Sequence, residues 1–194
     1  AGTSTAGAEA PPPEPEPAPV AEPEPEPPSG PGQIRVTNVV RGEEVGGTVQ
    51  VLSADGEVVA EGSSGDTFTV DSGQYRVQGA ITDDSILIDT PSHALDGAVT
   101  VSPGETATAR IDFPVSRVRI EVRRGGRSVA RWRLTVTRQG PEPGEEIVLE
   151  PSEEHVAITP GRYDGTLRFG GQQIEVSGLI FQGGATQTVP VNVN

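Results

Sequence analysis

From Gln33 to Asn194, apolar residues alternate with polar ones in short runs, and most of these runs end at a turn-forming sequence. Such alternation is typical of half-buried β-strands, because successive side chains point to opposite faces of a strand. In the first half of the chain the runs span residues 48–52, 58–60, 67–70, 75–81, 99–101 and 106–111. Asp55-Gly56 lies between two of them and predicts a β-hairpin. No amphipathic helical pattern of ten residues is found, so we expect an all-β fold.

The second half of the chain repeats features of the first half in the same order. Phe68–Val77 (FTVDSGQYRV) matches Val156–Gly165 (VAITPGRYDG) and aligns Tyr75 with Tyr163, an offset of 88 residues. Val101–Asp112 resembles Phe181–Asn192 at an offset of 80, and the segments that begin at Ile34 and Val118 match at an offset of 84. We interpret these three ordered matches as a tandem duplication of a unit of roughly 80 residues.

The repeat divides the chain into residues 1–32, 33–114 and 115–194. Six or seven short strands per unit are typical of an antiparallel sandwich. We therefore predict two tandem antiparallel β-sandwich domains of the Ig-like or prealbumin-like kind, one at residues 33–114 and one at residues 115–194. A disordered or polyproline tether, residues 1–32, precedes them.

The segment Val49–Val77 resembles the carboxypeptidase-regulatory-like, PEGA and Cna-B group of prealbumin-like sandwiches. The resemblance lies in a strand, an Asp-Gly turn, a second strand, and a strand that leads into a P-G-x-Y motif. That motif reads Ser72-Gly73-Gln74-Tyr75 in the first unit and Pro160-Gly161-Arg162-Tyr163 in the second. The resemblance implies an accessory or structural module without catalytic activity. The isopeptide bond of the Cna-B branch needs a lysine, and this chain has none.

The tether is rich in proline and glutamate. Proline fixes φ and lacks an amide N–H, so we expect neither a helix nor a sheet ladder through Pro11–Pro31. Glutamates without basic partners repel one another and extend such a segment further, toward about 3.1 Å per residue in polyproline II geometry. We interpret the tether as a spacer, and the alternative is a proline-rich ligand for a partner.

Composition places the chain outside the cytoplasm. The sequence has no cysteine, so it has no disulfide framework, thiolate nucleophile or cysteine metal site. It also has no methionine, and its small-residue start indicates a secreted protein whose signal peptide has been removed. No run of 18 apolar residues is present, so no membrane span is expected in this chain. We expect a periplasmic, outer-membrane-associated or extracellular location.

Charge differs sharply between the two units. The formal net charge of the chain is −14. Residues 33–114 carry 13 acids and 4 arginines, whereas residues 115–194 carry 9 acids and 10 arginines. Val118, Ile120 and Val122 alternate with arginines before a Gly125-Gly126 turn, and an alternating run follows it. A hairpin there would project one outward arginine face, and the candidate partner-binding residues are Arg117, Arg119, Arg123, Arg131 and Arg133. The alternative is a solvated face balanced by neighbouring acids.

Candidate catalytic and metal sites are weak. His93 and His155 lie in predicted loops at non-equivalent positions of the two units, so we expect surface histidines without a catalytic role. Asp83, Asp84 and Asp89 form a weak calcium candidate, because they lack the spaced D-x-D-x-D-G pattern. No cofactor is expected, and the overall acidity and scarce aromatic residues disfavour nucleic acid as a partner.

Three functions remain open. The first is a structural or interaction module of the bacterial cell envelope or surface, without catalytic activity. It would assemble with an envelope protein or head-to-tail with itself, because complementary charges lie in opposite halves of the chain. The second is a binding module for an anionic glycan, such as lipopolysaccharide, through the arginine face. The third, an enzyme, lacks identifiable acid, base and nucleophile groups.

Overall fold

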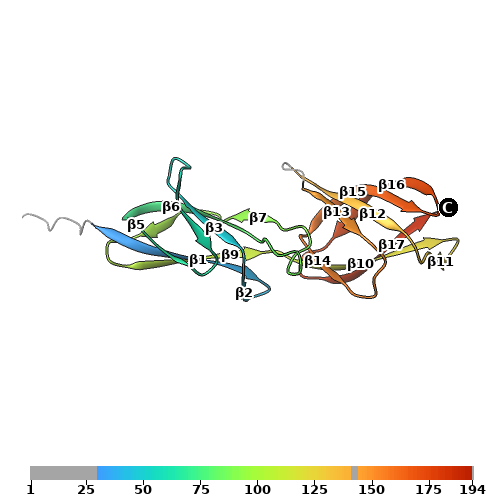
Figure 1. Ribbon diagram of the computed structural model, residues 1–194, viewed down its shortest axis with the longest axis horizontal. Coiled ribbons are helices and arrows are strands. Elements are labelled where there is room, and N and C mark those ends of the chain that lie inside the picture. Colours follow the sequence, from blue (N-terminus) through green and yellow to red (C-terminus); the bar gives the residue numbers. More distant parts are fainter. Residues whose placement is uncertain (1–29, 141–143, 194) are drawn as a thin grey trace, which may run out of the picture.

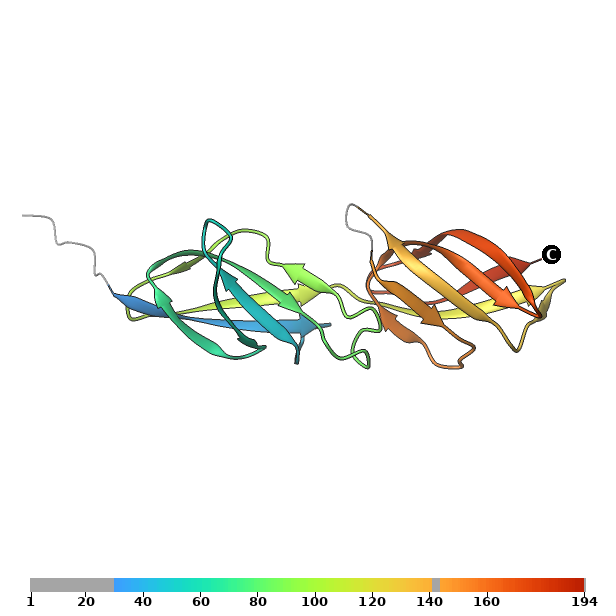
Figure 2. The ribbon, with the colours of Figure 1, turned by 45° about the horizontal axis from the view of Figure 1, so that its top comes forward.

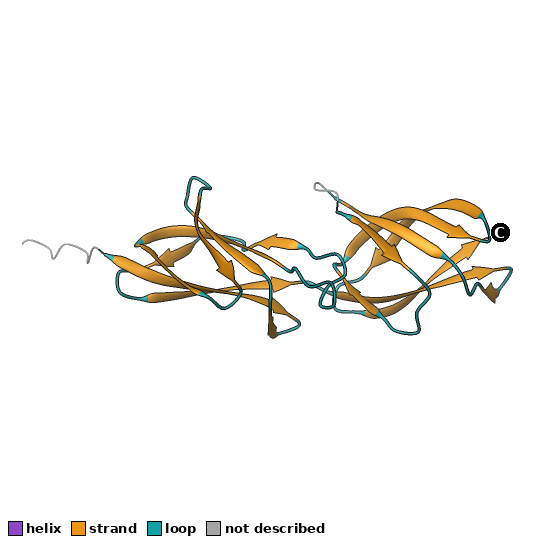
Figure 3. Ribbon diagram, viewed as in Figure 1, coloured by secondary structure: helices purple, strands orange, loops and turns teal. Residues whose placement is uncertain are grey.

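The computed structural model describes residues 30–140 and 144–193, and these residues form β-strands and loops without a helix (Figures 1 and 3). The strands build two β-sandwiches that follow one another along the long axis of the molecule, as predicted from the sequence. The described part of the chain contains no helical segment with the length and apolarity needed to span a bilayer. The predicted extended tether falls largely on residues 1–29, which lie outside the described residues.

The first sandwich packs two sheets around one apolar core. One sheet contains β1, β2, β5 and β9, and the other contains β3, β4, β6, β7 and β8. The core is built from residues between Ile34 and Val115. The strands are β1 (Pro31–Val40), β2 (Glu43–Val45), β3 (Thr48–Leu52), β4 (Val58–Ser63), β5 (Thr67–Asp71), β6 (Gly73–Ala80), β7 (Ser92–Ala94), β8 (Val99–Val101) and β9 (Thr106–Phe113).

The second sandwich has the corresponding strand order and its own core, which is built from residues between Val118 and Val193. One sheet contains β10, β11, β14 and β17, and the other has the order β13-β12-β15-β16. The strands are β10 (Ser116–Arg124), β11 (Arg127–Ser128), β12 (Arg133–Gln139), β13 (Glu146–Leu149), β14 (Val156–Ile158), β15 (Gly161–Phe169), β16 (Gln172–Phe181) and β17 (Thr186–Val193).

In each sandwich the first and last strands pair in parallel. The register of β1 and β9 runs from Gln33 opposite Thr106 to Val40 opposite Phe113. The register of β10 and β17 runs from Arg117 opposite Thr186 to Arg124 opposite Val193. The residues of β10 follow those of β1 at an offset of 84, and the residues of β17 follow those of β9 at an offset of 80. Two of the sequence matches have these same offsets. The common origin of the two halves stays a prediction.

Each sandwich also contains the same tyrosine contact. The Tyr75 hydroxyl donates to the Asp71 carbonyl at 2.8 Å, and the Tyr163 hydroxyl donates to the Thr159 carbonyl at 2.7 Å. Both bonds span four residues and tie the start of β6 or β15 to the turn before it. Burial raises the pKa of the Tyr163 phenol well above its usual range, so this hydroxyl stays protonated and remains a donor.

The first strand begins earlier than the sequence predicted. We expected no sheet ladder through Pro31, but β1 begins at that residue, opposite Asp71. Proline is tolerated as the first residue of a strand because the missing N–H is not needed there, and the Pro31 carbonyl accepts the Gly104 N–H at 2.9 Å. Gly32 follows because a β-carbon there would lie 2.3 Å from the Ser102 carbonyl oxygen.

The predicted arginine hairpin is wrong. After the Gly125-Gly126 turn, β10 pairs with the two-residue strand β11, and the chain then crosses to the opposite sheet, where it forms β12. The alternation itself is correct, because Val118, Val122 and Leu134 are all buried in the core. However, two strands that pack face to face across a core project their polar side chains in opposite directions. The arginines of β10 and β12 therefore do not form one sheet face.

The two sandwiches meet at a short joint. Strand β9 ends at Phe113 and β10 begins at Ser116, so two residues connect them (Figure 2). The Val115 side chain packs in the first core, while its carbonyl accepts the Gly184 N–H of the second sandwich at 2.8 Å. The loop after β6 adds two bonds across the joint: the Ile88 N–H donates to the Ala157 carbonyl at 3.0 Å, and the Asp89 carboxylate accepts the Thr159 N–H at 3.1 Å.

The two tyrosine contacts predict a difference in stability between matched variants. Tyr163→Phe should lower the free energy of unfolding by about 1–2 kcal/mol, because it removes a hydrogen bond from a fully buried carbonyl. Tyr75→Phe should cost less, since that bond is partly open to water. Urea denaturation of both variants measures the order, and an equal or reversed cost would contradict the assigned burial.

Candidate functional site

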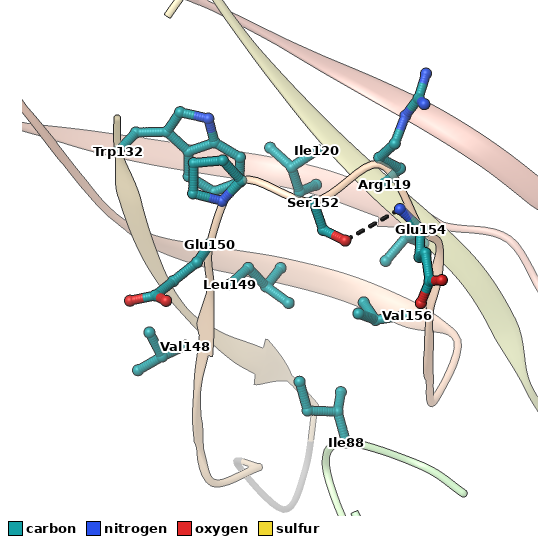
Figure 4. A pocket seen from close by; sticks show the side chains of 12 residues that line it. Ile88, Arg119, Ile120, Trp132, Val148, Leu149, Glu150, Ser152, Glu154 and Val156 are labelled. Atoms are coloured by element: carbon teal, nitrogen blue, oxygen red, sulfur yellow. Dashed lines mark hydrogen bonds between the residues drawn. The ribbon is translucent and has the colours of Figure 1, made fainter. Parts of the chain in front are cut away.

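A groove runs along one edge of the second sandwich, between its two sheets (Figure 4). Its volume is about 430 Å³. Ile88, from the first sandwich, lies at one end of the groove, and Trp132, just before β12, lies at the other. The wall between them is mostly apolar, and the segment Glu150–His155, which links β13 to β14, crosses the opening. The lining residues that shape it are Ile120, Trp132, Val148, Leu149, Pro151 and Val156.

The floor of the groove is an unpaired stretch of β10. On the side away from β17, β14 pairs with Ser116–Val118 and β11 pairs with Arg123 and Arg124. Even-numbered residues of β10 point their backbone groups to this side, as the bond from the Val129 N–H to the Val122 carbonyl shows. Ile120 lies in the gap between the two partners. Its N–H and carbonyl have no hydrogen-bond partner among residues 30–140 and 144–193.

The first sandwich closes the same edge. Val36 corresponds to Ile120 at the offset of 84 residues, and its N–H and carbonyl bond to the Asp66 carbonyl and the Gly65 N–H at 3.4 and 2.7 Å. The residue that corresponds to Trp132 is Gly47, and its carbonyl accepts the Ser64 N–H of the same loop at 2.9 Å. A β-carbon on Gly47 would lie 2.1 Å from the Ala80 carbonyl oxygen. The groove is therefore a departure of the second sandwich from the repeat.

Trp132 is the only tryptophan of the chain, and its side chain is 8% exposed. It lines the main groove and two neighbouring hollows, one beside Ser128 and Val129 and one beside the Gly170-Gly171 turn. Its indole N–H makes no hydrogen bond to any residue that the structure describes, and it is not among the buried unpaired groups there. An aromatic side chain of this kind offers an apolar face together with one polar donor.

Arginines lie at the groove and at the hollow on the other side of Trp132. Arg119 lies on the β10 side and donates to the Glu153 carbonyl at 3.4 Å. Arg131, Arg133 and Arg168 line the hollow on the β12 side of Trp132. Arg133 forms an exposed ion pair with Glu150 at 2.7 Å, and pairs of this kind contribute little to folding.

The remaining arginine candidates lie elsewhere on β10. Arg117 is exposed on the outer face of the β10 sheet, opposite Ala157 of β14. Arg123 pairs with Glu121 at 3.0 Å on that face. Hydrogen bonds from Arg123 and Ser128 lower the pKa of the Glu121 carboxyl below its usual range. Of the five predicted residues, Arg119 therefore lines the groove, Arg131 and Arg133 line the neighbouring hollow, and Arg117 and Arg123 lie outside both.

The histidine and calcium candidates do not form a chemical site. The His93 ring packs edge-on against Phe113 at the joint, with ring centroids 6.0 Å apart, and His155 lies in the loop before β14. Asp83 is engaged by Ser85, whose hydroxyl and N–H lower its pKa, and Asp89 is engaged by Thr159. Among the described residues, no three His, Cys, Asp or Glu side chains converge on a point that could hold a metal ion.

The groove can bind an extended polypeptide. It offers apolar walls, the small exposed part of Trp132, and one unpaired backbone N–H and carbonyl at a sheet edge, and an arginine-lined hollow lies next to it. A sheet edge binds a peptide through main-chain hydrogen bonds, and an aromatic groove binds proline-rich segments. The alternating pattern after Gly125-Gly126 did not predict the groove. The signal was present in the repeat, because a glycine of the first unit is replaced by a tryptophan between two arginines.

No family model and no curated protein matches this chain. Its similarity to the carboxypeptidase-regulatory-like, PEGA and Cna-B group therefore stays a resemblance. Similar solved structures include the Bacillus anthracis TIE protein (14% identity, TM-score 0.35), a streptococcal ancillary pilin (10%, 0.37) and the minor pilin of Streptococcus agalactiae (10%, 0.35). The alignments cover 84%, 84% and 83% of this chain and 34%, 62% and 94% of those chains. At TM-scores below 0.5, these likenesses carry no conclusion about function.

Substitutions at the groove should distinguish the contribution of apolar packing to the free energy of unfolding from that of the surface charges. Trp132→Ala should lower the free energy of unfolding by about 3 kcal/mol or more, because it empties a buried aromatic position. Glu150→Gln should cost less than about 1 kcal/mol, since it removes one partner of an exposed ion pair. Chemical denaturation measures both values. A large loss in Glu150→Gln would show that these surface charges are needed for folding rather than free for binding.

The Glu121 carboxyl predicts a dependence on pH. Because its pKa is lowered in the folded state, its contribution to stability is present above the unfolded pKa and is lost as pH falls through the folded pKa. Arg123→Gln should raise the pKa of Glu121 toward its usual value, since Arg123 supplies the largest cause of the shift. Arg119→Gln is the matched control and should raise it less. Carboxyl NMR titration distinguishes the two, and equal shifts would contradict the direct hydrogen bond.

Proposed function

We propose that this chain is a load-bearing structural and interaction module of the bacterial cell envelope or surface, without catalytic activity. It would assemble with another envelope protein or with copies of itself. The observation that carries the proposal is the path of the backbone from end to end. The chain enters the first sandwich through β1, leaves it through β9, continues into β10 and ends with β17, and in each sandwich these first and last strands are parallel partners.

This path places the hydrogen-bond ladders in shear when the two ends are pulled. The start of β1 and the end of β9 lie at opposite ends of the first sandwich, and eight residue pairs join the two strands. The same holds for β10 and β17, again with eight pairs. A pull along the strands loads all bonds of the ladder together, because it shears every inter-strand bond at the same time. A pull across the strands would break them one at a time.

The joint between the two sandwiches is short, so it would transmit a pulling force directly from one sandwich to the other. Two residues link the sandwiches, and Pro114 has a restricted φ. The contacts of Val115, Ile88 and Asp89 across the joint add bonds beside the covalent connection. The tether predicted from sequence would hold this rod away from the point where the chain is anchored.

The glycan alternative loses its main support. It depended on arginines gathered on one outward sheet face, and β10 and β12 belong to different sheets. A catalytic role lacks a constellation to argue from, since neither histidine has an acid or nucleophile as a hydrogen-bond partner among the described residues. Self-assembly or a protein partner therefore remains the stronger proposal for interaction.

Pulling geometry tests the load-bearing role. The chain has no native cysteine, so one introduced cysteine defines the second attachment point. With one handle at the N-terminus, Asp112→Cys at the far end of β9 loads the β1–β9 ladder in shear, and Glu105→Cys just before β9 peels the two strands apart. Both positions are exposed. Single-molecule force spectroscopy should record a clearly higher unfolding force for the Asp112→Cys geometry, and equal forces would refute the load-bearing path.

A further inference from the structure

The groove beside Trp132 adjoins a hollow that is lined by arginines, while the same edge of the first sandwich is closed. Arg119 lines the groove together with Glu150 and Glu154, and Arg131, Arg133 and Arg168 line the hollow. Arg131 has no hydrogen bond or ion pair with any described residue. Arg133 is held by one exposed carboxylate, Glu150, and Arg168 donates to the Gln173 side chain at 3.1 Å. Such contacts exchange readily for another carboxylate, because exposed ion pairs are weak.

The chain itself contains a segment with the complementary chemistry. Residues 9–28, here called the Pro/Glu segment, carry six glutamates and no basic residue, and they alternate proline with glutamate or alanine over most of their length. Proline rings pack on aromatic side chains in the grooves that recognise such segments. Arginine binds carboxylates through charge-assisted and often bidentate hydrogen bonds. The non-proline residues of the segment also carry backbone N–H groups. These groups can donate to the Ile120 carbonyl, which has no donor among the described residues.

We propose that the Trp132 groove binds the Pro/Glu segment of a second copy of this chain. Proline rings lie along the apolar wall beside Trp132, and the alternating glutamates reach the arginines that line the neighbouring hollow. The Ile120 N–H donates to a carbonyl of the segment, and the Ile120 carbonyl accepts an N–H from one of its glutamates. The result is a head-to-tail contact, in which the second sandwich of one copy holds the N-terminal segment of the next.

The distance between the start of β1 and the groove favours the segment of a second copy over the chain's own segment. β1 begins at the end of the first sandwich that is remote from the second, and Arg131–Arg133 lie beside the β15–β16 turn at the far end of the second sandwich (Figure 1). A segment folding back over both sandwiches would cross on the order of 50 Å, which uses about 16 residues of extended chain. Most of the glutamates would then lie along the two sandwiches and not at the groove. A copy placed end to end presents the whole Pro/Glu segment at the groove.

This proposal rests on the self-assembly part of the proposed function and not on the load-bearing role, because a groove can bind its ligand whatever force the ladders resist. The repeating contact is heterologous, so it propagates into a filament unless it closes into a ring. Charge complementarity would guide the register of the contact, and the apolar wall would supply much of its affinity.

Because Trp132 is the only tryptophan of the chain, its emission can report on binding at the groove. A synthetic peptide of residues 9–28 has no aromatic residue, so a change in tryptophan emission on its addition to the full chain reports on Trp132 alone. We expect a saturable change, a concentration-dependent mass by light scattering, and a loss of that mass as the peptide competes. A peptide with glutamine at every glutamate should bind at least about tenfold more weakly, because it lacks the charges that the arginines recognise.

Matched variants locate the contact. Arg131→Glu with Arg133→Glu should weaken peptide binding and self-association by about tenfold or more. Arg76→Glu with Arg110→Glu changes two exposed arginines of the first sandwich and should leave both unchanged. The proposal is overturned by a full chain that stays monomeric at high concentration and low salt. It is also overturned by self-association that the peptide does not compete, or by a peptide that leaves Trp132 emission unchanged.

Discussion

The parallel pairing of the first and last strands organises each sandwich. It brings the entry strand and the exit strand into one sheet, side by side, with their outer ends at opposite ends of the sandwich. The chain therefore leaves the first sandwich at the point where the second must begin, and a two-residue link is sufficient. A second unit with the same pairing extends the molecule along the same line (Figure 2). The rod shape and the path of load both follow from this one constraint.

The proposed binding site lies where the two units differ. In the first sandwich, the loop at Gly65 and Asp66 bonds to Val36, and the edge is closed by backbone hydrogen bonds. In the second, Trp132 occupies the position that corresponds to Gly47, and Ile120 is left facing a groove. Unpaired backbone groups at a sheet edge are a ready site for another chain. The second sandwich thus has one sheet edge that is open at Ile120, and the corresponding edge of the first sandwich is closed at Val36.

The strand pattern was largely predictable from sequence, because alternation of Val118, Ile120 and Val122 reports directly which face is buried. The pairing of the strands was not predictable, since a run of alternating residues does not indicate which strand it pairs with. The residues after Gly125-Gly126 read as the second arm of a hairpin, but a two-residue strand and a crossing to the other sheet intervene. The predicted arginine face failed for that reason. Arg131 and Arg133 lie at the hollow beside Trp132, whose position depends on contacts far apart in sequence.

Native-state hydrogen exchange tests most directly whether the two parallel ladders are the structural basis of the molecule. The amides to follow are Arg35, Thr37 and Val39 in β1 and Arg119, Glu121 and Arg123 in β10, which point toward β9 and β17. If the ladders hold each sandwich together, these amides exchange only through global unfolding, with an opening free energy equal to the full stability of the sandwich. Exchange of these amides through local opening, well below that free energy, would contradict the account.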